Sequence, residues 1–538
     1  MRPGGVLVVG IDGGTWDVLG PLARRGVMPT MTRVLEEGAA GELTSVVPWY
    51  TMPGWTSLMT GANPGRHGIL HWVKSEAPDY WESRRPGRPF IASGDIPLPT
   101  FWDVAGAAGK RVAVVNMPIT YPAWPVNGTM VTGLLTPAGD LPGQSYPDGV
   151  LSDYPEYRVD LRHAKGREAE GRLPPVPQIL TEMADVTRRR TRLMTELTAG
   201  DVDLAVMVFV GMDRVSHRAW PEQEAVLTKP EAEWGEVERL VAGYYRSLDG
   251  VIGSLIAAAG DRSTVLFASD HGFGPGPDRK FRANAWLRDA GYLGLRAGGL
   301  QRAAYASVLR KAASKAMKAW RRRGGRAAEH LGVSWARSSA YAVHFSWCPL
   351  FGVTVNEWGA KRQGSVARAE IPGLLSKLES DLRGVRDADM GLPVVWRVYR
   401  REEVAEGPEI HRLPHLFVEV DPRYFPDDGL RRAEVFGDLE TASGRHTREG
   451  LLGARGARVN RGFDGAARIE DVGPTVLALL GLEAPPTMDG AVRNDLVDVA
   501  GNLAAAPETS APNAGAVALS DQDQAEIERH LRELGYEE

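Results

Sequence analysis

Three segments of the sequence share one feature: a short apolar run, rich in β-branched residues, that ends at acidic or imidazole side chains. They are Asp12 after run 6–11, Asp213 and His217 after run 204–210, and Asp270 with His271 after run 264–269. Carboxylate and imidazole groups are ligands for divalent metal ions. In open α/β sheets the functional site lies beyond the carboxyl ends of the strands. Three strands that bring such residues to one edge therefore predict a metal site.

Each of these motifs has a second interpretation when it is taken alone. Asp213 and His217 are four residues apart, so on a helical turn they could bind one ion or simply form a surface hydrogen bond. Asp270 and His271 precede Gly272 and could form a turn closed by the aspartate side chain. The segment 12–15, Asp-Gly-Gly-Thr, could cradle a phosphate in a sugar-kinase-like fold. The three motifs together favour the metal site.

A fourth segment, 47–61, supplies a hydroxyl group. Pro53 suits the first turn of a helix and Gly61 suits its end. Thr51 would then lie at the beginning of this helix, where free backbone N–H groups and the helix dipole favour a phosphate. A helix cap is the alternative role for Thr51. A hydroxyl close to a divalent ion loses its proton more readily, so we predict that Thr51 is a covalent nucleophile.

The elements that must position these side chains alternate between short strands and longer helices. We expect strands at 6–11, 112–116, 204–210, 264–269, 351–355 and 416–420, and helices at 28–37, 176–199 and 236–259. Strands that alternate with helices are typical of a parallel sheet covered by helices on both faces. The sequence therefore predicts an α/β fold with a mostly parallel central sheet.

The composition changes along the chain and predicts its division. A basic segment, 302–326, is either a solvated helix face or a source of positive charge toward an anionic substrate. A stretch rich in Ala, Pro, Ser and Asn reads as a linker, and Ile527, Leu531 and Leu534 recur at helical spacing. The expected parts are a catalytic core at 1–295 completed by 436–502, an inserted cap at 296–435, a linker at 503–518 and an amphipathic helix at 519–538.

The overall charge excludes some classes of partner. The chain has 63 Lys and Arg residues against 68 Asp and Glu residues, a net charge of −5, so we expect no binding to nucleic acid or to anionic membranes. The single cysteine, Cys348, excludes an internal disulfide framework and a Cys-rich zinc ribbon. No apolar run approaches the roughly 18 residues of a membrane span. Because the first apolar run is too short for the core of a signal peptide, we expect a cytoplasmic location.

The order of these motifs resembles the alkaline phosphatase superfamily. Within it, the sequence is similar to the branch of type I phosphodiesterases and nucleotide pyrophosphatases, particularly to bacterial proteins described as predicted phosphohydrolases or phosphomutases. The motifs that carry the resemblance are 10–13, 51–57, 60–69, 212–217, 269–273, 444–446, 471–477 and 488–490. The resemblance implies an alkaline-phosphatase-like α/β fold with an inserted cap subdomain.

The resemblance also implies a site for two divalent metal ions. His446 is selected among nearby histidines, such as His411 and His415, by its Gly-Arg-His context. Zinc suits these carboxylate and imidazole ligands, and manganese is the alternative. One ion would be bound by Asp12, Asp270, His271 and the Thr51 oxygen, and the other by Asp213, His217 and His446.

The activity that the resemblance implies is hydrolysis of phosphate esters, of the phosphodiesterase or nucleotide pyrophosphatase type. Thr51 would attack phosphorus and give a phosphothreonine intermediate, with a small phosphate-ester or nucleotide-like molecule as substrate. Nucleotide pyrophosphatases carry an asparagine about twenty residues after the nucleophile, and the matching residue here is Trp72, a candidate substrate-binding residue.

Other functions remain open at this point. A phosphomutase or a phosphomonoesterase of the same superfamily would use the same ligands. A non-catalytic protein that binds nucleotide or phosphate is a further alternative. A sulfatase is disfavoured, because position 51 holds neither Cys nor Ser. The sequence leaves the oligomeric state open.

Overall fold

The computed structural model of the protein describes residues 1–74, 89–137, 141–161, 174–296, 333–345, 347–359, 364–430, 434–439, 443–499, 501–511 and 519–533. The chain forms two compact units. Unit 1 contains Met1–Trp72, Phe90–Pro275 and His446–Glu538, and unit 2 contains Val73–Pro89 and Gly276–Arg445. The basic segment 302–326 lies outside the described residues, as does 512–518 of the expected linker.

Unit 1 is built on a nine-stranded sheet with the order β20-β2-β19-β7-β1-β6-β3-β4-β5. Five neighbouring strands, from β7 to β4, are parallel to one another, whereas β19 is antiparallel to both β7 and β2. The expected mostly parallel sheet is therefore confirmed. Its strands are β1 (Val6–Ile11), β2 (Ala39–Thr44), β3 (Val112–Met117), β4 (Gly128–Thr132), β5 (Ser145–Tyr146), β6 (Leu204–Phe209), β7 (Thr264–Ala268), β19 (Glu449–Arg455) and β20 (Ala466–Arg468).

The central strands form where the sequence has its uninterrupted apolar runs. Every residue of β1, β3, β6 and β7 is buried, as expected for parallel strands that are covered on both faces. Alternate residues of β1 point to opposite faces. Leu7, Val9 and Ile11 pack into the core beneath the helices of one face, and on the other face Gly10 lies against the Trp55 ring.

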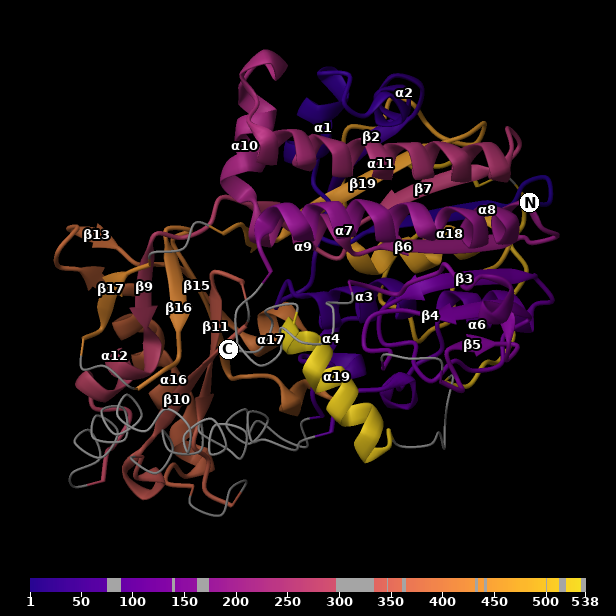
Figure 1. Ribbon diagram of the computed structural model, residues 1–538. Coiled ribbons are helices and arrows are strands. Elements are labelled where there is room, and N and C mark those ends of the chain that lie inside the picture. Colours follow the sequence, from indigo (N-terminus) through magenta and orange to yellow (C-terminus); the bar gives the residue numbers. More distant parts are fainter. Residues whose placement is uncertain are drawn as a thin grey trace. The chain divides into compact units, whose positions relative to one another are not determined.

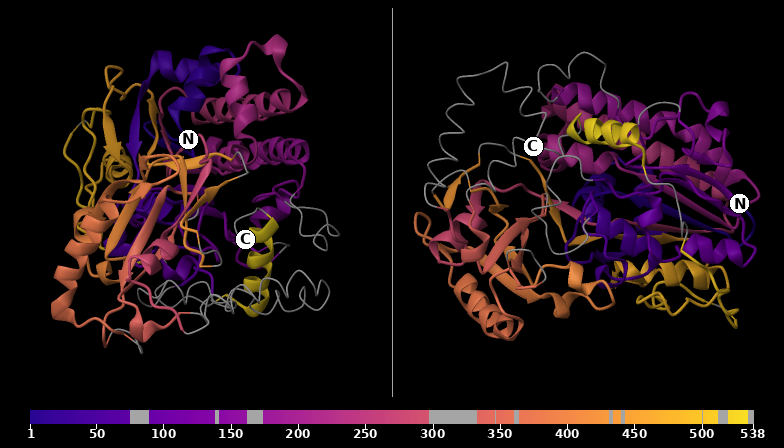
Figure 2. Two further views of the ribbon diagram at one scale, coloured as in Figure 1. Left: turned by 90° about the vertical axis from the view of Figure 1, so that its left-hand side faces the viewer. Right: turned by 90° about the horizontal axis from the view of Figure 1, so that it is seen from below.

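Helices cover both faces of this sheet (Figures 1 and 2). The helices over one face are α1 (Trp16–Arg24), α2 (Pro29–Glu37), α7 (Val176–Arg189), α8 (Thr191–Ala199), α10 (Trp220–Thr228) and α11 (Glu236–Ala259). Those over the other face are α3 (Thr51–Thr60), α6 (Phe101–Ala107) and α18 (Val472–Leu479), which contact one another. Two short helices, α4 (Pro64–His67) and α9 (Gly211–Arg218), coincide with the motif segments 60–69 and 212–217, and α19 (Asp521–Glu533) is the last helix described.

The single helix expected at 176–199 is wrong: two helices, α7 and α8, meet at Arg190. The guanidinium of Arg190 is buried and donates hydrogen bonds to the carbonyl oxygens of Arg158 and Val159. This anchoring of a side chain to a distant loop holds the junction in place. Neither proline nor glycine marks the break.

Unit 2 contains an antiparallel sheet with the order β10-β11-β15-β14 and a three-stranded sheet with the order β16-β9-β17. The expected insert, 296–435, lies within this unit, but the unit is larger: its long segment runs from Gly276 to Arg445, because β9 pairs with β16 and β17, and Val73–Pro89 also belongs to it. Its role as a cap stays a prediction. Its elements are β9 (Arg279–Arg282), α12 (Ala283–Asp289), β10 (Ala340–His344), β11 (Leu350–Val355), α16 (Ile371–Arg383), β12 (Arg386–Asp387), β13 (Leu392–Pro393), β14 (Val395–Arg400), α17 (Arg401–Val404), β15 (Leu416–Val420), β16 (Tyr424–Asp427) and β17 (Phe436–Asp438).

Within the part of the chain that the structure describes, no helix combines the length and the apolar character that a bilayer crossing requires. The cytoplasmic location stays a prediction.

Helix α3 packs closely against the end of β7. A Cβ atom at Gly54 would lie 2.9 Å from both the Cβ atom and the carbonyl oxygen of Asp270. Only a residue without a side chain fits at this contact. The missing side chain at Gly54 therefore allows the first turn of α3 to approach the end of β7 closely.

We expect Gly54→Ala to lower the free energy of unfolding by about 1–3 kcal/mol, because the added methyl group overpacks this contact. Helix propensity alone predicts the opposite sign, since alanine is favoured over glycine in a helix by up to about 1 kcal/mol. Urea unfolding followed by circular dichroism measures the difference. The matched control is Gly243→Ala in α11, where the new Cβ meets no atom within 4 Å and we expect a gain of about 0.4–1 kcal/mol. A gain in both variants would contradict the close contact.

Candidate active site

Three neighbouring strands of the sheet, β7, β1 and β6, bring acidic residues to one edge. They are adjacent and parallel, so their carboxyl ends lie together. Asp12 follows β1, Asp270 follows β7, and Asp213 lies on α9, which begins just after β6. This is the arrangement that the three apolar runs predict.

His446 reaches the same edge from a strand that runs the other way. It lies on β18 (Arg445–Thr447), which pairs with β8 (Gly272–Gly274) beside Asp270. The next strand, β19, is antiparallel to β7. The beginning of β19 therefore lies where β7 ends, and His446, which precedes it, joins the cluster.

Thr51 lies at the beginning of α3, as predicted. The preceding residue, Tyr50, is extended, and the helix ends at Gly61, whose φ of 62° is the left-handed conformation common at helix ends. The hydroxyl of Thr51 is buried. Gly54, one turn further along α3, is packed on Asp270, so the beginning of this helix lies over the same edge of the sheet.

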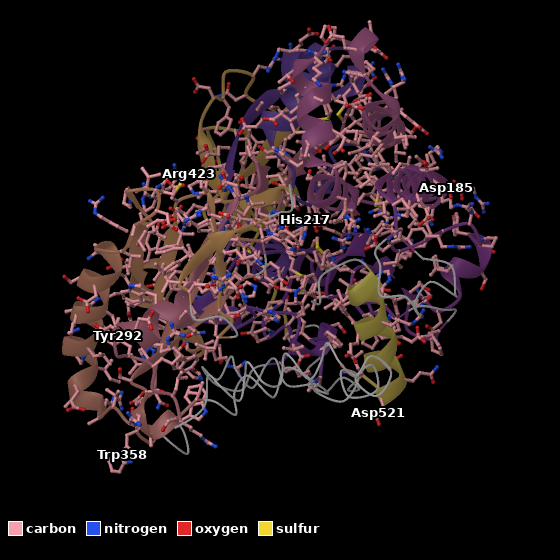
Figure 3. The ribbon with its side chains drawn as sticks, turned by 60° about the vertical axis from the view of Figure 1, so that its left-hand side comes forward. Asp185, His217, Tyr292, Trp358, Arg423 and Asp521 are labelled. Carbon is pink, nitrogen blue, oxygen red and sulfur yellow. The ribbon has the colours of Figure 1, made fainter. Side chains whose placement is uncertain are left out.

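Asp213, His217 and His446 form one tight group of donor atoms. Asp213 and His217 lie on one face of α9, as their spacing predicts. The Nε2 atoms of His217 and His446 each lie 3.3 Å from Asp213 Oδ1. The same two Nε2 atoms are 2.9 Å apart. Donor atoms this close together, all buried, could bind one metal ion. Figure 3 labels His217.

Asp12, Asp270 and His271 form the adjoining group. His271 Nε2 is 3.2 Å from Asp270 Oδ2 and 3.7 Å from Asp12 Oδ1. Asp12, Asp213 and His271 also offer ligand atoms within 4.8 Å of one another. The ring of His271 stacks on that of His446, with 3.7 Å between the centroids. The two groups are thus contiguous, and the structure brings together all six Asp and His residues expected to bind metal.

A metal ion fits the hydrogen bonding of this site. Within the described residues, several buried polar atoms of the site make no hydrogen bond to the protein, among them Asp12 Oδ1, Thr51 Oγ1, Asp270 Oδ2 and His271 Nε2. A buried polar atom without a partner is costly, and such atoms in a folded protein call for an explanation such as an ion. All four atoms belong to residues that the resemblance assigns to the metal site.

The opposite oxygen of each carboxylate is held by the protein. The indole Nε1 of Trp55 donates to Asp12 Oδ2 over 3.1 Å, and the backbone N–H of Gly13 donates to Asp270 Oδ1 over 3.2 Å. Arg214 Nη1 donates to Asp213 Oδ2 over 2.6 Å. Each aspartate therefore keeps its second oxygen for the centre of the site. Such orienting partners set the geometry of metal ligands.

Sequence reasoning missed these partners, although Trp55 and Arg214 both lie inside quoted motifs.

The histidines are oriented as well. His271 Nδ1 lies 3.0 Å from the carbonyl oxygen of Gly272. A proton on Nδ1 donates to that carbonyl and leaves Nε2 with a lone pair for a metal.

The electrostatics show that the site holds more negative charge than it can keep in the absence of cations. Burial, reinforced by Asp213, raises the pKa of Asp12 well above its usual value, and burial together with Asp12 does the same to the pKa of Asp270. Burial lowers the pKa of His446 to about 4 and that of His271 well below its ordinary value. The imidazoles of His271 and His446 are therefore neutral and able to bind a metal ion. Divalent ions would favour the charged form of both carboxylates.

Asp213 behaves differently from the other two carboxylates. Burial acts to raise its pKa, but His217, His446 and Arg214 outweigh burial and hold the pKa well below the usual range. Asp213 is thus the one site carboxylate whose charge the protein itself stabilises.

Trp72 lies in an aromatic cluster beside the site. Its ring meets that of Tyr50 edge to face, with 5.3 Å between centroids. Tyr50 in turn stacks on His446 at 6.3 Å. Trp72 is buried, and its role in substrate binding stays a prediction.

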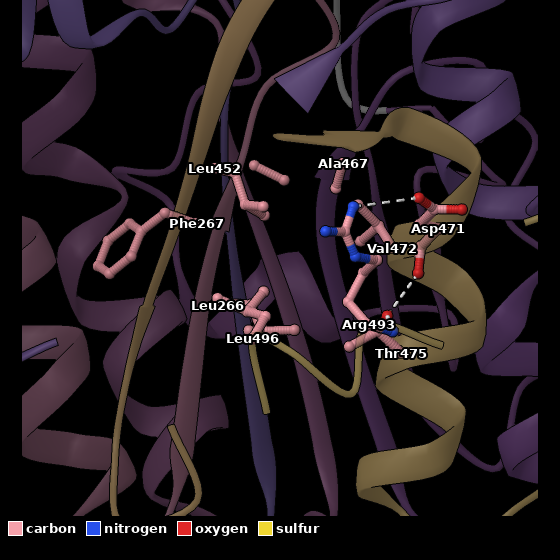
Figure 4. A pocket seen from close by; sticks show the side chains of 10 residues that line it. Leu266, Phe267, Leu452, Ala467, Asp471, Val472, Thr475, Arg493 and Leu496 are labelled. Carbon is pink, nitrogen blue, oxygen red and sulfur yellow. Dashed lines mark hydrogen bonds and ion pairs between the residues drawn. The ribbon is translucent and has the colours of Figure 1, made fainter. Parts of the chain in front are cut away.

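A small internal cavity lies elsewhere in unit 1, between β7, β19 and α18 (Figure 4). Apolar side chains such as Leu266 and Leu452 line it, together with the ion pair of Arg493 with Asp471, whose atoms are 3.7 Å apart. None of the predicted site residues lines this cavity. It is part of the packing behind the sheet.

Two solved structures are similar to this chain. Phosphonoacetate hydrolase from Sinorhizobium meliloti 1021, in complex with phosphonoacetate, has a TM-score of 0.53 and 16% sequence identity, over 89% of this chain and 96% of that chain. An inactive form of murine ectonucleotide pyrophosphatase/phosphodiesterase 5, in complex with AMP, has a TM-score of 0.48 and 14% identity, over 92% of this chain and 100% of that chain. The likeness to the hydrolase shows that the fold is alkaline-phosphatase-like.

No curated protein matches this sequence. The family model of the type I phosphodiesterases and nucleotide pyrophosphatases, however, matches residues 6–447. This region includes all seven residues expected at the metal site, from Asp12 to His446. Because the match spans most of the chain, the protein belongs to the type I phosphodiesterase/nucleotide pyrophosphatase family of the alkaline phosphatase superfamily and is a phosphoester hydrolase of that type.

Proposed function

We propose that this protein is a metal-dependent phosphohydrolase that cleaves small phosphate esters through a covalent phosphothreonine intermediate at Thr51. The observation that carries the proposal is the packing of the first turn of α3 on Asp270, which brings the buried Thr51 hydroxyl to the edge of the sheet where the Asp and His residues meet. The substrate we propose is a phosphodiester, such as a nucleotide-like molecule.

Two divalent ions, which we propose are zinc, fit the two groups of ligands. When bound, such ions neutralise charge on a phosphoryl group and lower the pKa of a hydroxyl beside them. Manganese is the alternative. One ion would be held by Asp12, Thr51, Asp270 and His271, and the other by Asp213, His217 and His446.

The steps assigned to the protein are two displacements at phosphorus. In the first, Thr51 Oγ1 gives up its proton to solvent and attacks, so that an Oγ1–P bond forms, the P–O bond to the leaving group breaks and the leaving oxygen departs with the bonding electron pair. In the second, water attacks phosphorus, the Oγ1–P bond breaks, and Thr51 recovers a proton. The backbone N–H groups at the beginning of α3 are aimed at the negative charge that develops on the phosphoryl oxygens.

A phosphomutase would differ only in the second step, because a hydroxyl group of the product would replace water as the acceptor. No contact described above favours that acceptor over water. Hydrolysis is therefore the proposal that we develop.

We expect Thr51→Ala to lower kcat by more than about 10³-fold, because the nucleophile is lost. Thr51→Ser keeps a hydroxyl group and is expected to keep measurable turnover. Hydrolysis of an aryl phosphodiester by the zinc-loaded protein measures both, and the thermal melting temperature checks that both variants fold. Acid quenching of the wild type, followed by mass spectrometry, should find a phosphoryl group on the peptide that contains Thr51. Turnover by Thr51→Ala at the wild-type rate would refute the covalent step.

We expect the metal-free protein, prepared with a chelator, to bind two zinc ions and to release protons as it binds them. The raised pKa values of Asp12 and Asp270 mean that these carboxyls hold protons in the metal-free protein, whereas the lowered pKa values of His271 and His446 mean that these rings do not. Zinc affinity should therefore rise with pH until both carboxyls are ionised.

Calorimetry in buffers with different ionisation enthalpies measures the number of protons released. Asp12→Asn should release fewer protons, because one of the protonated carboxyls is gone. Zinc binding that releases no protons at any pH would contradict the charge state described for the site.

We expect a bis-aryl phosphate to be a better substrate than the matching mono-aryl phosphate, as the phosphodiesterase assignment requires. We further expect Trp72→Ala to raise KM for the diester by about fivefold with a smaller change in kcat, because a lost aromatic contact of about 1 kcal/mol affects binding. Steady-state kinetics on both substrates measure this. Trp102→Ala, in α6 and outside the site, is the control for loss of a buried tryptophan. A faster reaction with the monoester would replace the diesterase by a phosphomonoesterase.

A further inference from the structure

The C-terminal helix α19 lies outside the region that the family model matches, residues 6–447, and yet it belongs to the same compact unit as the site. It docks through specific contacts. The backbone N–H of Phe90 donates to Gln524 Oε1 over 2.7 Å, and Tyr121 Oη donates to Asp523 Oδ1 over 3.5 Å. Ile527 and Leu531 are buried. Figures 1 and 2 show the helix against unit 1, and Figure 3 labels Asp521 at its exposed beginning.

A buried chain of charged groups leads from the metal ligand Asp213 away from the centre of the site. Arg214 uses its two terminal nitrogens for two different carboxylates. Nη1 donates to Asp213 Oδ2 over 2.6 Å, and Nη2 donates to Asp160 Oδ2 over 3.0 Å. The side chains of Arg214, Asp160 and Asp213 are 4%, 1% and 0% exposed. A buried guanidinium held between two carboxylates has little freedom to turn.

The far end of this chain is a residue of α19. His530 Nε2 lies 3.9 Å from Asp160 Oδ2, the same oxygen that accepts from Arg214. The other oxygen, Asp160 Oδ1, accepts from the backbone N–H of Leu161 over 2.8 Å. Burial acts to raise the pKa of Asp160, but Arg214, His530, Arg190 and the backbone N–H of Leu161 together outweigh burial and lower the pKa. His530 therefore helps to stabilise the anion that holds Arg214.

We infer that α19 is a positioning arm for the metal group formed by Asp213, His217 and His446. His530 stabilises Asp160, Asp160 fixes Arg214, and Arg214 holds one oxygen of Asp213 so that the other faces the two imidazoles. His530 is a positioning residue, since it acts through Asp160 and Arg214. This inference rests on the proposed function, because it assumes that this group binds a metal ion.

The inference predicts an effect on one metal site and not on the other. We expect His530→Ala in the full chain to weaken zinc binding at one of the two sites by about tenfold, the range found for partners that orient metal ligands. Binding at the site of Asp12, Asp270 and His271 should stay unchanged. Calorimetric titration of the metal-free protein with zinc resolves binding at the two sites. Deletion of 519–538 should weaken the same site at least as much.

Two variants of α19 serve as controls. Gln522→Ala changes an exposed residue on the same helix and should bind both ions as the wild type does. His530→Gln keeps a polar donor opposite Asp160 and should recover most of the lost affinity, which a purely packing role for His530 would not produce.

The outcomes separate the two proposals. Loss of affinity at one site only, with recovery in His530→Gln and an unchanged melting temperature of the metal-free protein, supports the positioning arm. Wild-type affinities in His530→Ala and in the deletion overturn it and leave the proposed function intact. An equal loss at both sites, with a lower melting temperature, also overturns it, because α19 would then only stabilise the fold. A wild-type chain that binds no zinc overturns both proposals.

Discussion

The crowding of carboxylates at one buried edge of a sheet is the constraint on which the rest of this structure depends. Asp12, Asp213 and Asp270 are completely buried and lie close enough to disturb one another's ionisation. A fold tolerates such a cluster only if something offsets its charge. The protein does so for one carboxylate, through Arg214 and two histidines, and leaves the other two with raised pKa values. Bound cations would offset the negative charge of these two carboxylates, Asp12 and Asp270.

The topology explains how residues so far apart in the chain come to share this edge. Parallel strands send their carboxyl ends to the same side, which accounts for Asp12, Asp270 and the beginning of α9. A purely parallel sheet could not deliver His446 from the beginning of a strand. The reversed strand β19 makes this possible, since it starts where β7 ends. Because β19 is antiparallel to β7, the candidate ligand His446 reaches the edge where β7 ends without a further loop across the sheet.

The sequence predicts the central strands and the acidic residues that follow three of them, because uninterrupted apolar runs are read directly and the polar residues come after them. His446 follows no such run and is selected only through the resemblance to the family. The contacts it does not reveal are those between distant segments. Trp55 reaches Asp12 through space, and the N–H of Gly13 is a backbone group that no residue type announces. The pairing of Arg214 with Asp160 joins residues 54 positions apart, and no local pattern indicates it. The helical pattern of the sequence likewise continues across Arg190. In the structure α7 ends there, and the Arg190 side chain contacts the distant loop at Arg158 and Val159.

The pairing of β8 with β18 has a consequence for how this chain could change. The chain leaves unit 1 just after β8 and returns to it at β18, so the two ends of the inserted unit are joined side by side in one ladder. Residues that we propose as metal ligands lie on both sides of the gap, at Asp270 and His271 before it and at His446 after it. Because the ladder holds these ends together whatever lies between them, the inserted segment could be exchanged or resized during evolution without moving a ligand. The catalytic edge and the segment inserted into it are thus free to diverge at different rates.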